Sequence, residues 1–495
     1  MLGSRRRLLR VFFALVIALS LGSVGGSFVT AKPNLAETHA QGSENLPGYT
    51  APPVYVDQTG APGTSNRSES NATHSSLQVR ANDSQADIEG DIGEVTVVST
   101  QGFYVSDEDA ELVAFSESGR VLYYDNTYGV YFDVDPVPGT TYTVEYLASE
   151  SLSGEECRSV RTDRCTYNVY KRLNLSTGEQ RDVYGEVTPR IFSGRWHDID
   201  RINETHIAIA DIIRDSVRIV DTATNETVWE WNASTYFPED VGGAEGDWTH
   251  INDVEVLDDG RIMVGVRNMD RVVFVEPGKG VQPNWTLGEE DNYSILYEQH
   301  NPDYIPRERG GPAITVADSE NSRVLEYQRR NGSWTRSWGW HDSRLQWPRD
   351  ADRLPSGTTL VTDTHGDRVV EVAPNGTVVW SVTVGMPYEA ERLGTGDEST
   401  GGESMRDIRA SSGNIEHSSN SGISVFWRTL REVVPSLPVN GALYASPYWI
   451  RFPELVFLGT AGLSALIWGG LEIRWAGLDL RATVQKLRSR TRINR

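Results

Sequence analysis

The chain has 495 residues, 38% of them hydrophobic, which is enough for several domains or one large repeat fold. Its formal net charge of -23 excludes the basic surface that a nucleic-acid partner needs. Only Lys32, Lys171, Lys279 and Lys486 are lysines, and strong salt screening tolerates a dense negative surface. We therefore expect a halophilic archaeal source; an ordinary acidic secreted protein is the alternative.

The first segment, residues 1–31, is predicted to be a signal peptide or a transmembrane anchor. Three arginines, Arg5, Arg6 and Arg7, precede an apolar run over residues 8–27. Residues 32–92 are rich in Ser, Asn, Gly and Pro and poor in large apolar groups. We expect them to form a disordered linker, because such a composition cannot bury enough apolar surface to fold.

Residues 93–392 carry an internal repeat that predicts an all-β domain. Segments Asp198–Asp211, Asp253–Val266 and Asp350–Asp363 align without gaps, each as strand, polar turn and strand. A third strand and a tryptophan-bearing fourth strand follow each segment. Four strands in about fifty residues are typical of a propeller blade. The fold class is thus a six-bladed β-propeller flanked by N- and C-terminal transmembrane helices; a β-sandwich and a solenoid are the alternatives.

Cys157 and Cys165, the two cysteines of the chain, lie close together within this domain. In an oxidising exterior they are expected to form one local disulfide. A metal site needs more ligands than this segment offers.

The C-terminal part is predicted to consist of four segments of different composition. Residues 393–420 are predicted to be a second linker. Residues 421–454 have apolar groups at helical spacing, which predicts an amphipathic segment near the membrane surface. Residues 455–472 are predicted to form a transmembrane helix, at the short end of the spanning range. Residues 473–495 form a basic tail, which the positive-inside rule places in the cytoplasm.

Both basic ends then lie inside, and the protein is predicted to sit in the cell membrane with its main domain outside the cell. Asn-x-Ser/Thr sequons give an independent sign of export, because all eleven fall between the two apolar runs. The predicted glycosylation sites are Asn66, Asn71, Asn82, Asn174, Asn203, Asn225, Asn232, Asn284, Asn292, Asn331 and Asn375.

Propeller topology predicts that several polar residues converge at one mouth of the central channel. The innermost strand of each blade begins on the face to which the loop between the second and third strands returns. The inner strands begin at His197, His250, His300, Asn301 and Arg349, and the returning loops carry Arg267, Asn268 and His365. Packing alone does not explain a ring of histidines, so we expect these residues to form a site.

Three aspartates at the starts of inner strands allow two interpretations. Asp198, Asp253 and Asp350 could surround a cation such as Ca²⁺ in the channel, or they could cap strand ends. We favour capping, and no other cofactor is predicted.

The segment DWTHINDVEVLDDGRIMVGVRNMDRVVFVE (Asp247–Glu276), followed by NWTLG and EQHNPDYI, resembles the aryl-sulfate sulfotransferase family. The likeness is clear over about residues 245–390 and looser in the earlier blades. It implies a six-bladed propeller in which a histidine takes a sulfuryl group from an aryl sulfate and passes it to a phenol. No nucleotide sulfate donor is implied.

The resemblance also assigns roles. His250 matches the histidine after Asp-Trp, His300 matches the Gln-His pair, and Arg267 matches the arginine of the following turn. His365 is the third catalytic candidate by position, and the nucleophile is expected to be His365 or His300. Asn268, Asn301, His197 and Arg349 are expected to bind substrate.

Two other functions remain open from the sequence. One is a non-catalytic, membrane-anchored surface propeller that binds glycans or proteins, and the other is a propeller hydrolase or lyase. Bacterial members of the resembled family carry an extra N-terminal β-domain, for which residues 32–90 offer no counterpart.

Overall fold

The computed structural model describes residues 2–43, 84–86, 93–102, 110–342, 344–412, 422–444, 446 and 450–476. It divides into a propeller unit, Leu35–Ala445, and a helical unit made of Met1–Asn34 and Ser446–Arg495.

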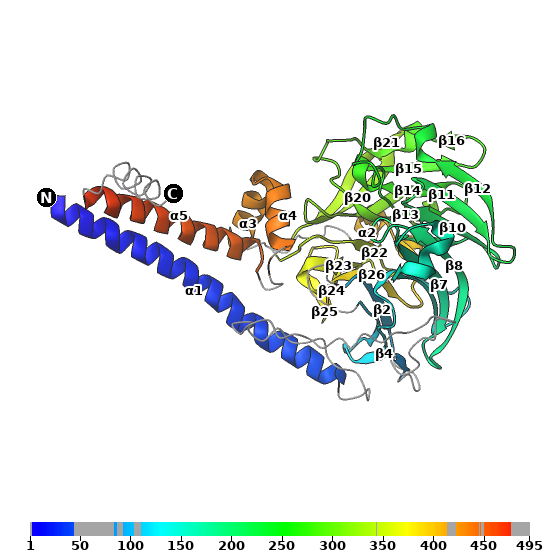
Figure 1. Ribbon diagram of the computed structural model, residues 1–495, viewed down its shortest axis with the longest axis horizontal. Helices are drawn as coiled ribbons and strands as arrows, with labels where there is room; N and C mark the ends of the chain where they lie inside the picture. Colours follow the sequence, from blue (N-terminus) through cyan, green and yellow to red (C-terminus); the bar gives the residue numbers. More distant parts are fainter. Residues whose placement is uncertain are drawn as a thin grey trace, which may run out of the picture. The chain divides into compact units, whose positions relative to one another are not determined.

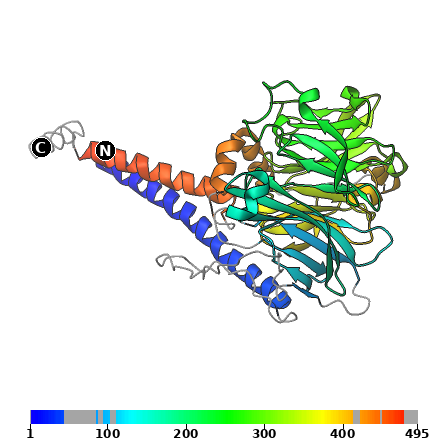
Figure 2. The same ribbon diagram turned by 45° about the vertical axis from the view of Figure 1, so that its right-hand side comes forward.

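The propeller unit contains six antiparallel sheets arranged as blades of one ring (Figure 1; Figure 2). Blade 1 contains β1 (Ser84–Ala86), β2 (Val95–Thr100), β3 (Leu112–Ser116), β4 (Val121–Asp125) and β26 (Pro387–Arg392). Blade 2 contains β5 (Val130–Pro136), β6 (Thr143–Ser153), β7 (Arg164–Asn174) and β8 (Glu179–Pro189). Blade 3 contains β9 (Ile199–Arg201), β10 (His206–Asp211), β11 (Ser216–Asp221) and β12 (Glu226–Asn232).

The other three blades follow in chain order and confirm the predicted six-bladed fold. Blade 4 contains β13 (Ile251–Val256), β14 (Ile262–Val266), β15 (Arg271–Glu276), β16 (Gly280–Val281) and β17 (Leu287–Gly288). Blade 5 contains β18 (His300–Ile305), β19 (Ala313–Asp318), β20 (Arg323–Arg330) and β21 (Ser333–Trp340). Blade 6 contains β22 (Asp350–Arg353), β23 (Thr359–Asp363), β24 (Arg368–Val372) and β25 (Val378–Thr383).

Short 3₁₀ helices occupy several connections. They are η1 (Gly154–Val160), η2 (Ala233–Thr235), η3 (Arg267–Met269), η4 (Pro283–Trp285), η5 (Arg307–Arg309), η6 (Thr364–Gly366) and η7 (Glu398–Gly401). Of these, η3 and η6 are the loops between the second and third strands of blades 4 and 6, where the sequence predicted site residues.

The apolar pattern of each strand reflects its place in the blade. The second strands are covered on both faces by neighbouring blades, so β14 is buried along its whole length. The outermost strand β12 has one solvent-facing side and is largely exposed. This layering places the core between successive sheets, rather than within one of them.

Blade 1 closes the ring with strands from opposite ends of the propeller. β2 pairs antiparallel with β26, with Val98 opposite Ala390. The sequence analysis did not predict β26 as an inner strand, because it belongs to none of the recognised repeats. Closure by the last strand gives the ring a sixth inner strand at the channel.

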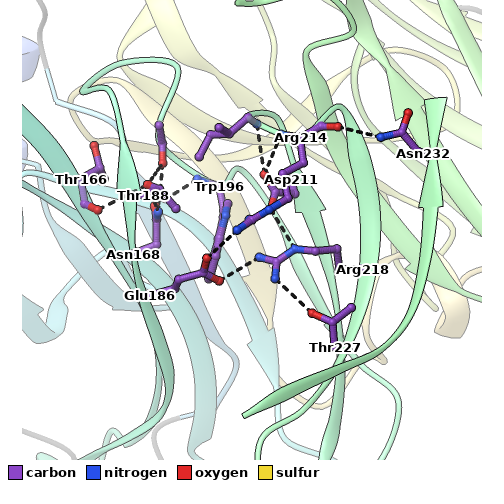
Figure 3. Close-up of polar contacts among 12 residues, drawn as sticks. Thr166, Asn168, Glu186, Thr188, Trp196, Asp211, Arg214, Arg218, Thr227 and Asn232 are labelled. Carbon is purple, nitrogen blue, oxygen red and sulfur yellow. Dashed lines mark hydrogen bonds and ion pairs between the residues drawn. The ribbon is translucent and has the colours of Figure 1, made fainter. Parts of the chain in front are cut away.

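The interface between blades 2 and 3 shows how neighbouring sheets are fixed (Figure 3). Glu186 of β8 accepts hydrogen bonds from Arg214 at 2.9 Å and Arg218 at 3.0 Å. The Trp196 ring stacks on Tyr184 with 5.9 Å between ring centroids. The Arg218 guanidinium lies over the Trp196 ring, 5.5 Å from its centroid. These contacts hold the residue that directly precedes His197.

The predicted disulfide is confirmed. Cys157 of η1 and Cys165 of β7 are bonded to each other, and both are buried. The bond ties the excursion after β6 back onto its own blade.

Two predicted linkers are shorter than expected. Within 393–420, residues 398–412 form η7 and α2 (Met405–Ser412), because Ser399 and Met405 are buried against the blades. Within 32–92, α1 extends to Ser43 and β1 pairs with β4. Residues 44–83, 87–92 and 413–421 lie outside the described residues.

The segment predicted to lie near the membrane forms two helices of the propeller unit, α3 (Gly422–Val433) and α4 (Ser436–Tyr444). The side chain of Phe426 is 57% exposed, whereas Leu443 is buried. The helices therefore pack one side against the propeller, which the sequence analysis did not predict.

The helical unit contains α1 (Leu2–Ser43) and α5 (Phe452–Trp475). Each has a stretch long and apolar enough to cross a membrane, Arg6–Ser27 and Phe452–Trp475. The helices run antiparallel, because Arg10 bonds Glu472 at 2.6 Å and Ser27 bonds Glu454 at 2.6 Å. The two apolar helices could thus anchor the protein in a membrane. Of the predicted basic tail, residues 477–495 lie outside the described residues.

None of the sequon asparagines in the described residues is buried. Those are Asn174, Asn203, Asn225, Asn232, Asn284, Asn292, Asn331 and Asn375. Asn66, Asn71 and Asn82 lie outside the described residues. Glycosylation of all eleven stays a prediction.

Candidate functional site

Three histidines from the starts of inner strands meet around one tyrosine. The rings of His197 and His250 are 4.9 Å apart between centroids. Tyr388 of β26 lies 6.1 Å from His197 and 6.2 Å from His300, again between ring centroids. Blades 3, 4, 5 and 1 therefore each contribute a ring to the same mouth of the channel.

Arg349 and His300 form the buried centre of this mouth. Arg349 Nη1 contacts the ring nitrogens of His300, and both side chains are buried. His300 Nδ1 also lies 2.9 Å from Ser319 Oγ and 3.1 Å from the Glu298 carbonyl oxygen. Burial, and then the charge of Arg349, holds the pKa of His300 well below its ordinary value. The imidazole is neutral at physiological pH.

His250 forms a dyad with a carboxylate. Its Nδ1 lies 2.6 Å from Asp247 Oδ1, and Asn268 Nδ2 donates to the Asp247 carbonyl oxygen at 2.6 Å. Burial and the nearby Arg267 guanidinium lower the pKa of His250 to about 4, against the opposing effect of Asp247. His250 also adopts a left-handed backbone with φ of 46°, a conformation that costs energy for a non-glycine residue and is often found at functional sites.

His365 lies beside a pocket of about 370 Å³. The pocket is lined by Arg267, Glu298, Glu320, Ser322, Gln346, Trp347, His365, Asn440, Gly441 and Leu443. The His365 ring meets Trp347 edge to face with centroids 4.7 Å apart, and the Arg349 guanidinium lies 3.8 Å from the centroid of Trp347. Burial, followed by the charge of Arg349, lowers the pKa of His365 to about 3. The pocket therefore presents a neutral imidazole and the Arg267 guanidinium, and Arg349 lies behind Trp347 of its wall.

Helix α4 provides one wall of this pocket. Asn440 Nδ2 donates to the Glu320 carbonyl oxygen at 3.0 Å, and Arg431 of α3 contacts Asn440 Oδ1. Glu320 in turn accepts from Trp347 Nε1 at 2.6 Å. Hydrogen bonds through Glu320 thus connect α4 to Trp347, whose ring contacts His365.

The structure brings all the predicted histidines and arginines to one mouth: His197, His250, His300, His365, Arg267 and Arg349. Of the two predicted asparagines, Asn268 supports Asp247, and Asn301 donates to Glu389 in the channel at 3.2 Å. The roles assigned to these residues stay predictions.

Sequence reasoning missed three residues of the mouth: Asp247, Glu298 and Tyr388. Asp247 had a usable signal, because it lies three residues before His250 in the quoted motif. Glu298 pairs with Arg267, a contact that only the turn between blades creates. Tyr388 had no signal, since it belongs to the closing strand β26.

Two of the three aspartates that were weighed as cation ligands, Asp198 and Asp350, accept hydrogen bonds from neighbouring inner strands. Asp198 accepts from the Val254 amide, and Asp350 Oδ2 accepts from the Ala390 amide at 3.1 Å. Burial raises the pKa of Asp198 to about 8 and that of Asp350 to about 7. These bonds join neighbouring inner strands rather than capping strand ends, and each uses one oxygen of the carboxyl group.

The low pKa of His365 leads to a prediction about stability. Below the ordinary pKa of 6.5 the unfolded chain takes up a proton that the folded His365 does not. The wild type therefore loses stability on acidification relative to His365→Gln, by about 2 kcal/mol between pH 7 and pH 5. Urea unfolding of both proteins at the two pH values measures this difference. If the difference in unfolding free energy between the two proteins is the same at pH 7 and pH 5, the imidazole protonates freely in the folded state.

Comparison with known proteins gives one family. The family model described as Arylsulfotransferase (ASST) matches residues 197–341, which include His197, His250, Arg267 and His300. No curated protein matches the chain.

Solved structures are similar in part. The periplasmic gluconolactonase of Pseudomonas aeruginosa has 12% identity and a TM-score of 0.40, over 61% of this chain and 99% of that one. A virginiamycin B lyase from Staphylococcus aureus has 8% identity and a TM-score of 0.34, over 63% of this chain and 87% of that one.

Proposed function

We propose that this protein is an aryl-sulfate sulfotransferase that moves a sulfuryl group from an aryl sulfate to a phenol through a sulfohistidine. The observation that supports it most is the group of four neutral histidines and two arginines at one mouth of the propeller. The match of residues 197–341 to the arylsulfotransferase model supports the same activity in general. A non-catalytic surface propeller has no need of such a group.

His365 is the proposed nucleophile, because it lines the pocket whereas His300 is 2% exposed and covered by Arg349. A neutral imidazole nitrogen attacks the sulfur atom, forming an N–S bond while the S–O bond to the aryl group breaks. The electron pair of that bond leaves with the phenolate. The low pKa of His365 keeps its lone pair available over the whole physiological range.

His250, held by Asp247, is the proposed acid and base. It protonates the departing phenolate and later takes the proton of the incoming phenol, whose oxygen then attacks the sulfohistidine. In the empty site burial and Arg267 keep the pKa of His250 low. An anionic sulfate beside Arg267 offsets that positive charge and raises the pKa of His250 toward the working range.

Arg267 and Arg349 are proposed to hold the sulfate oxygens. A guanidinium offers a planar fork of donors, and its charge stabilises the oxygens as the sulfuryl group is transferred. A cationic mouth in a protein of net charge -23 also concentrates an anionic donor at this point of the surface.

The proposed location is the cell membrane. Helices α1 and α5 anchor the chain, the propeller faces the exterior, and the basic tail 473–495 is cytoplasmic. The acidic composition and the sequons suit a glycosylated protein of a halophilic archaeon. Substituted-cysteine labelling in intact cells, at Ser234 of the propeller and at Ser489 of the tail, tests the two sides.

The activity is tested on the full chain in detergent, in concentrated salt. 4-Nitrophenyl sulfate as donor and phenol as acceptor should release 4-nitrophenolate, and a ³⁵S-labelled donor should label histidine on the protein. His206→Asn is the matched control, since His206 lies in β10 and outside the mouth. If the folded protein neither releases the phenolate nor takes up label, the non-catalytic alternative is favoured.

A further inference from the structure

The central channel below the histidines is lined by carboxyl groups from all six inner strands. These are Asp133, Asp135, Asp198, Asp200, Asp253, Glu255, Asp303, Asp350, Asp352, Glu389 and Glu391, joined by Asp397 and Glu398 from the segment after β26. Most are buried, and burial raises the pKa of each of them, with repulsion between neighbouring carboxyl groups adding to it for Asp133, Asp303, Asp352, Glu389 and Glu398. So many carboxyl groups in one channel need either protons or a cation.

Their structural role accounts for only part of their oxygens. Asp133 Oδ2 accepts from the Ile199 amide at 3.0 Å, as Asp350 does from Ala390, and each bond joins two inner strands. Asp133 Oδ1 and Asp350 Oδ1 are buried and have no hydrogen-bond partner among the described residues. The strand-joining bonds therefore leave one buried oxygen of each group unsatisfied, which is uncommon for buried polar atoms.

Asp352 is the clearest case. Its side chain is 1% exposed, and its oxygens accept no hydrogen bond from an amide, hydroxyl or guanidinium group among the described residues. They interact instead with the carboxyl groups of Asp303 and Asp350. It serves no strand-joining bond, so the fold alone gives no reason for an acidic group here. Such a crowded, buried carboxyl group is unfavourable as an anion unless it takes up a proton or binds a cation.

Four carboxyl groups, Asp303, Asp350, Asp352 and Glu398, converge with oxygens all within 4.8 Å of one another. Ca²⁺ takes about six to eight oxygen ligands in a flexible geometry, whereas Mg²⁺ keeps several waters and is held by one or two carboxylates, so a group of four carboxyl groups suits Ca²⁺. The group contains only oxygen ligands, without His or Cys, which suits a hard cation rather than zinc. Asp303 also accepts from Ser399 at 2.5 Å, which brings η7 to the same point.

We propose that Asp303, Asp350, Asp352 and Glu398 bind a divalent cation, Ca²⁺ in preference to Mg²⁺, inside the propeller channel. The two inner strands β18 and β22 supply three ligands, and η7 supplies the fourth. The bound ion neutralises part of the acidic channel and fastens the segment that follows the last blade to the centre of the ring. It is a structural site, separate from the proposed sulfuryl transfer.

Calorimetric titration of the chelator-treated full-length protein with CaCl₂ tests the proposal. We expect saturable binding and a rise in the midpoint of thermal unfolding, with MgCl₂ binding at least about tenfold more weakly. Asp352→Asn should weaken Ca²⁺ binding at least tenfold, whereas Glu239→Gln, an exposed carboxyl group outside the channel, should leave it unchanged.

The result is independent of enzymatic activity, because the readout is heat and unfolding temperature. If Asp352→Asn fails to fold, Glu398→Gln gives the same comparison at the ligand from η7. Absence of saturable Ca²⁺ binding to the wild type would overturn the proposal. Equal affinity in the wild type and in the folded ligand variant would do so as well.

Discussion

Replacing His365 by asparagine is expected to lower kcat for sulfuryl transfer at least about 10³-fold and to abolish labelling of the protein by the donor. The substitution removes the imidazole of His365, and with it the ring nitrogen that forms the N–S bond in the proposed mechanism. Asparagine retains a polar side chain of moderate size, so the wall formed with Trp347 and Gln346 remains. Initial rates of 4-nitrophenolate release and ³⁵S incorporation measure the two effects.

Two companion variants separate the nucleophile from the other histidines of the mouth. His300→Asn removes the partner of Arg349 and should reduce the rate, but the protein should still take up label on His365. His206→Asn should behave as the wild type. If His365→Asn retains labelling and His300→Asn loses it, the nucleophile is His300 and the pocket argument is wrong.

Arg353→Met is expected to destabilise the propeller by about 3–5 kcal/mol, the largest effect on stability that we foresee for a single substitution. Arg353 of blade 6 and Glu326 of blade 5 are both fully buried, with Nη2 and Oε2 3.0 Å apart. Without the guanidinium, Glu326 remains as a buried charge. Urea unfolding of the detergent-solubilised chain, followed by tryptophan fluorescence, gives the free energy of unfolding.

The double variant Arg353→Met, Glu326→Gln tests whether the unpaired charge of Glu326 causes the loss of stability. Glu326 also accepts from the Met405 amide at 2.9 Å and from Ser337 at 2.6 Å, and the glutamine oxygen can keep one such bond. We expect the double variant to recover at least half of the lost free energy. A double variant as unstable as Arg353→Met would instead assign the loss to packing against Trp338, whose ring centroid is 5.1 Å from the guanidinium.

The repeat was the part of the fold that the sequence could reveal. Segments such as Asp198–Asp211 and Asp350–Asp363 combine a period-2 pattern with polar turns at fixed spacing, and each formed the predicted pair of strands. The closing strand β26 could not be found in that way, because its partner β2 lies far away in sequence and it resembles no repeat. Helix α2 was not predicted for a related reason, since tertiary packing rather than local pattern holds it, whereas the helical spacing within residues 421–454 did indicate α3.

The convergence of the histidines at one mouth could be predicted, because propeller topology determines the face at which each inner strand begins. Once the inner strands are identified, His250 and His300 must begin at the same face. The contacts that set their chemistry were beyond this reasoning: the dyad with Asp247, and the contact of Arg349 with His300. Such contacts depend on left-handed turns and side-chain rotamers that no repeat pattern encodes.

The closure of blade 1 also has a consequence for the order of synthesis. Val98 emerges from the ribosome almost three hundred residues before Ala390, the residue opposite it. Until then the inner edge of β2 has unpaired amide and carbonyl groups, and the nascent ring stays open. Contacts between residues so distant in sequence form slowly, so a growing chain exposes this edge longer than any other. Premature pairing of that edge with a second chain is therefore the misassembly to which the nascent protein is most exposed.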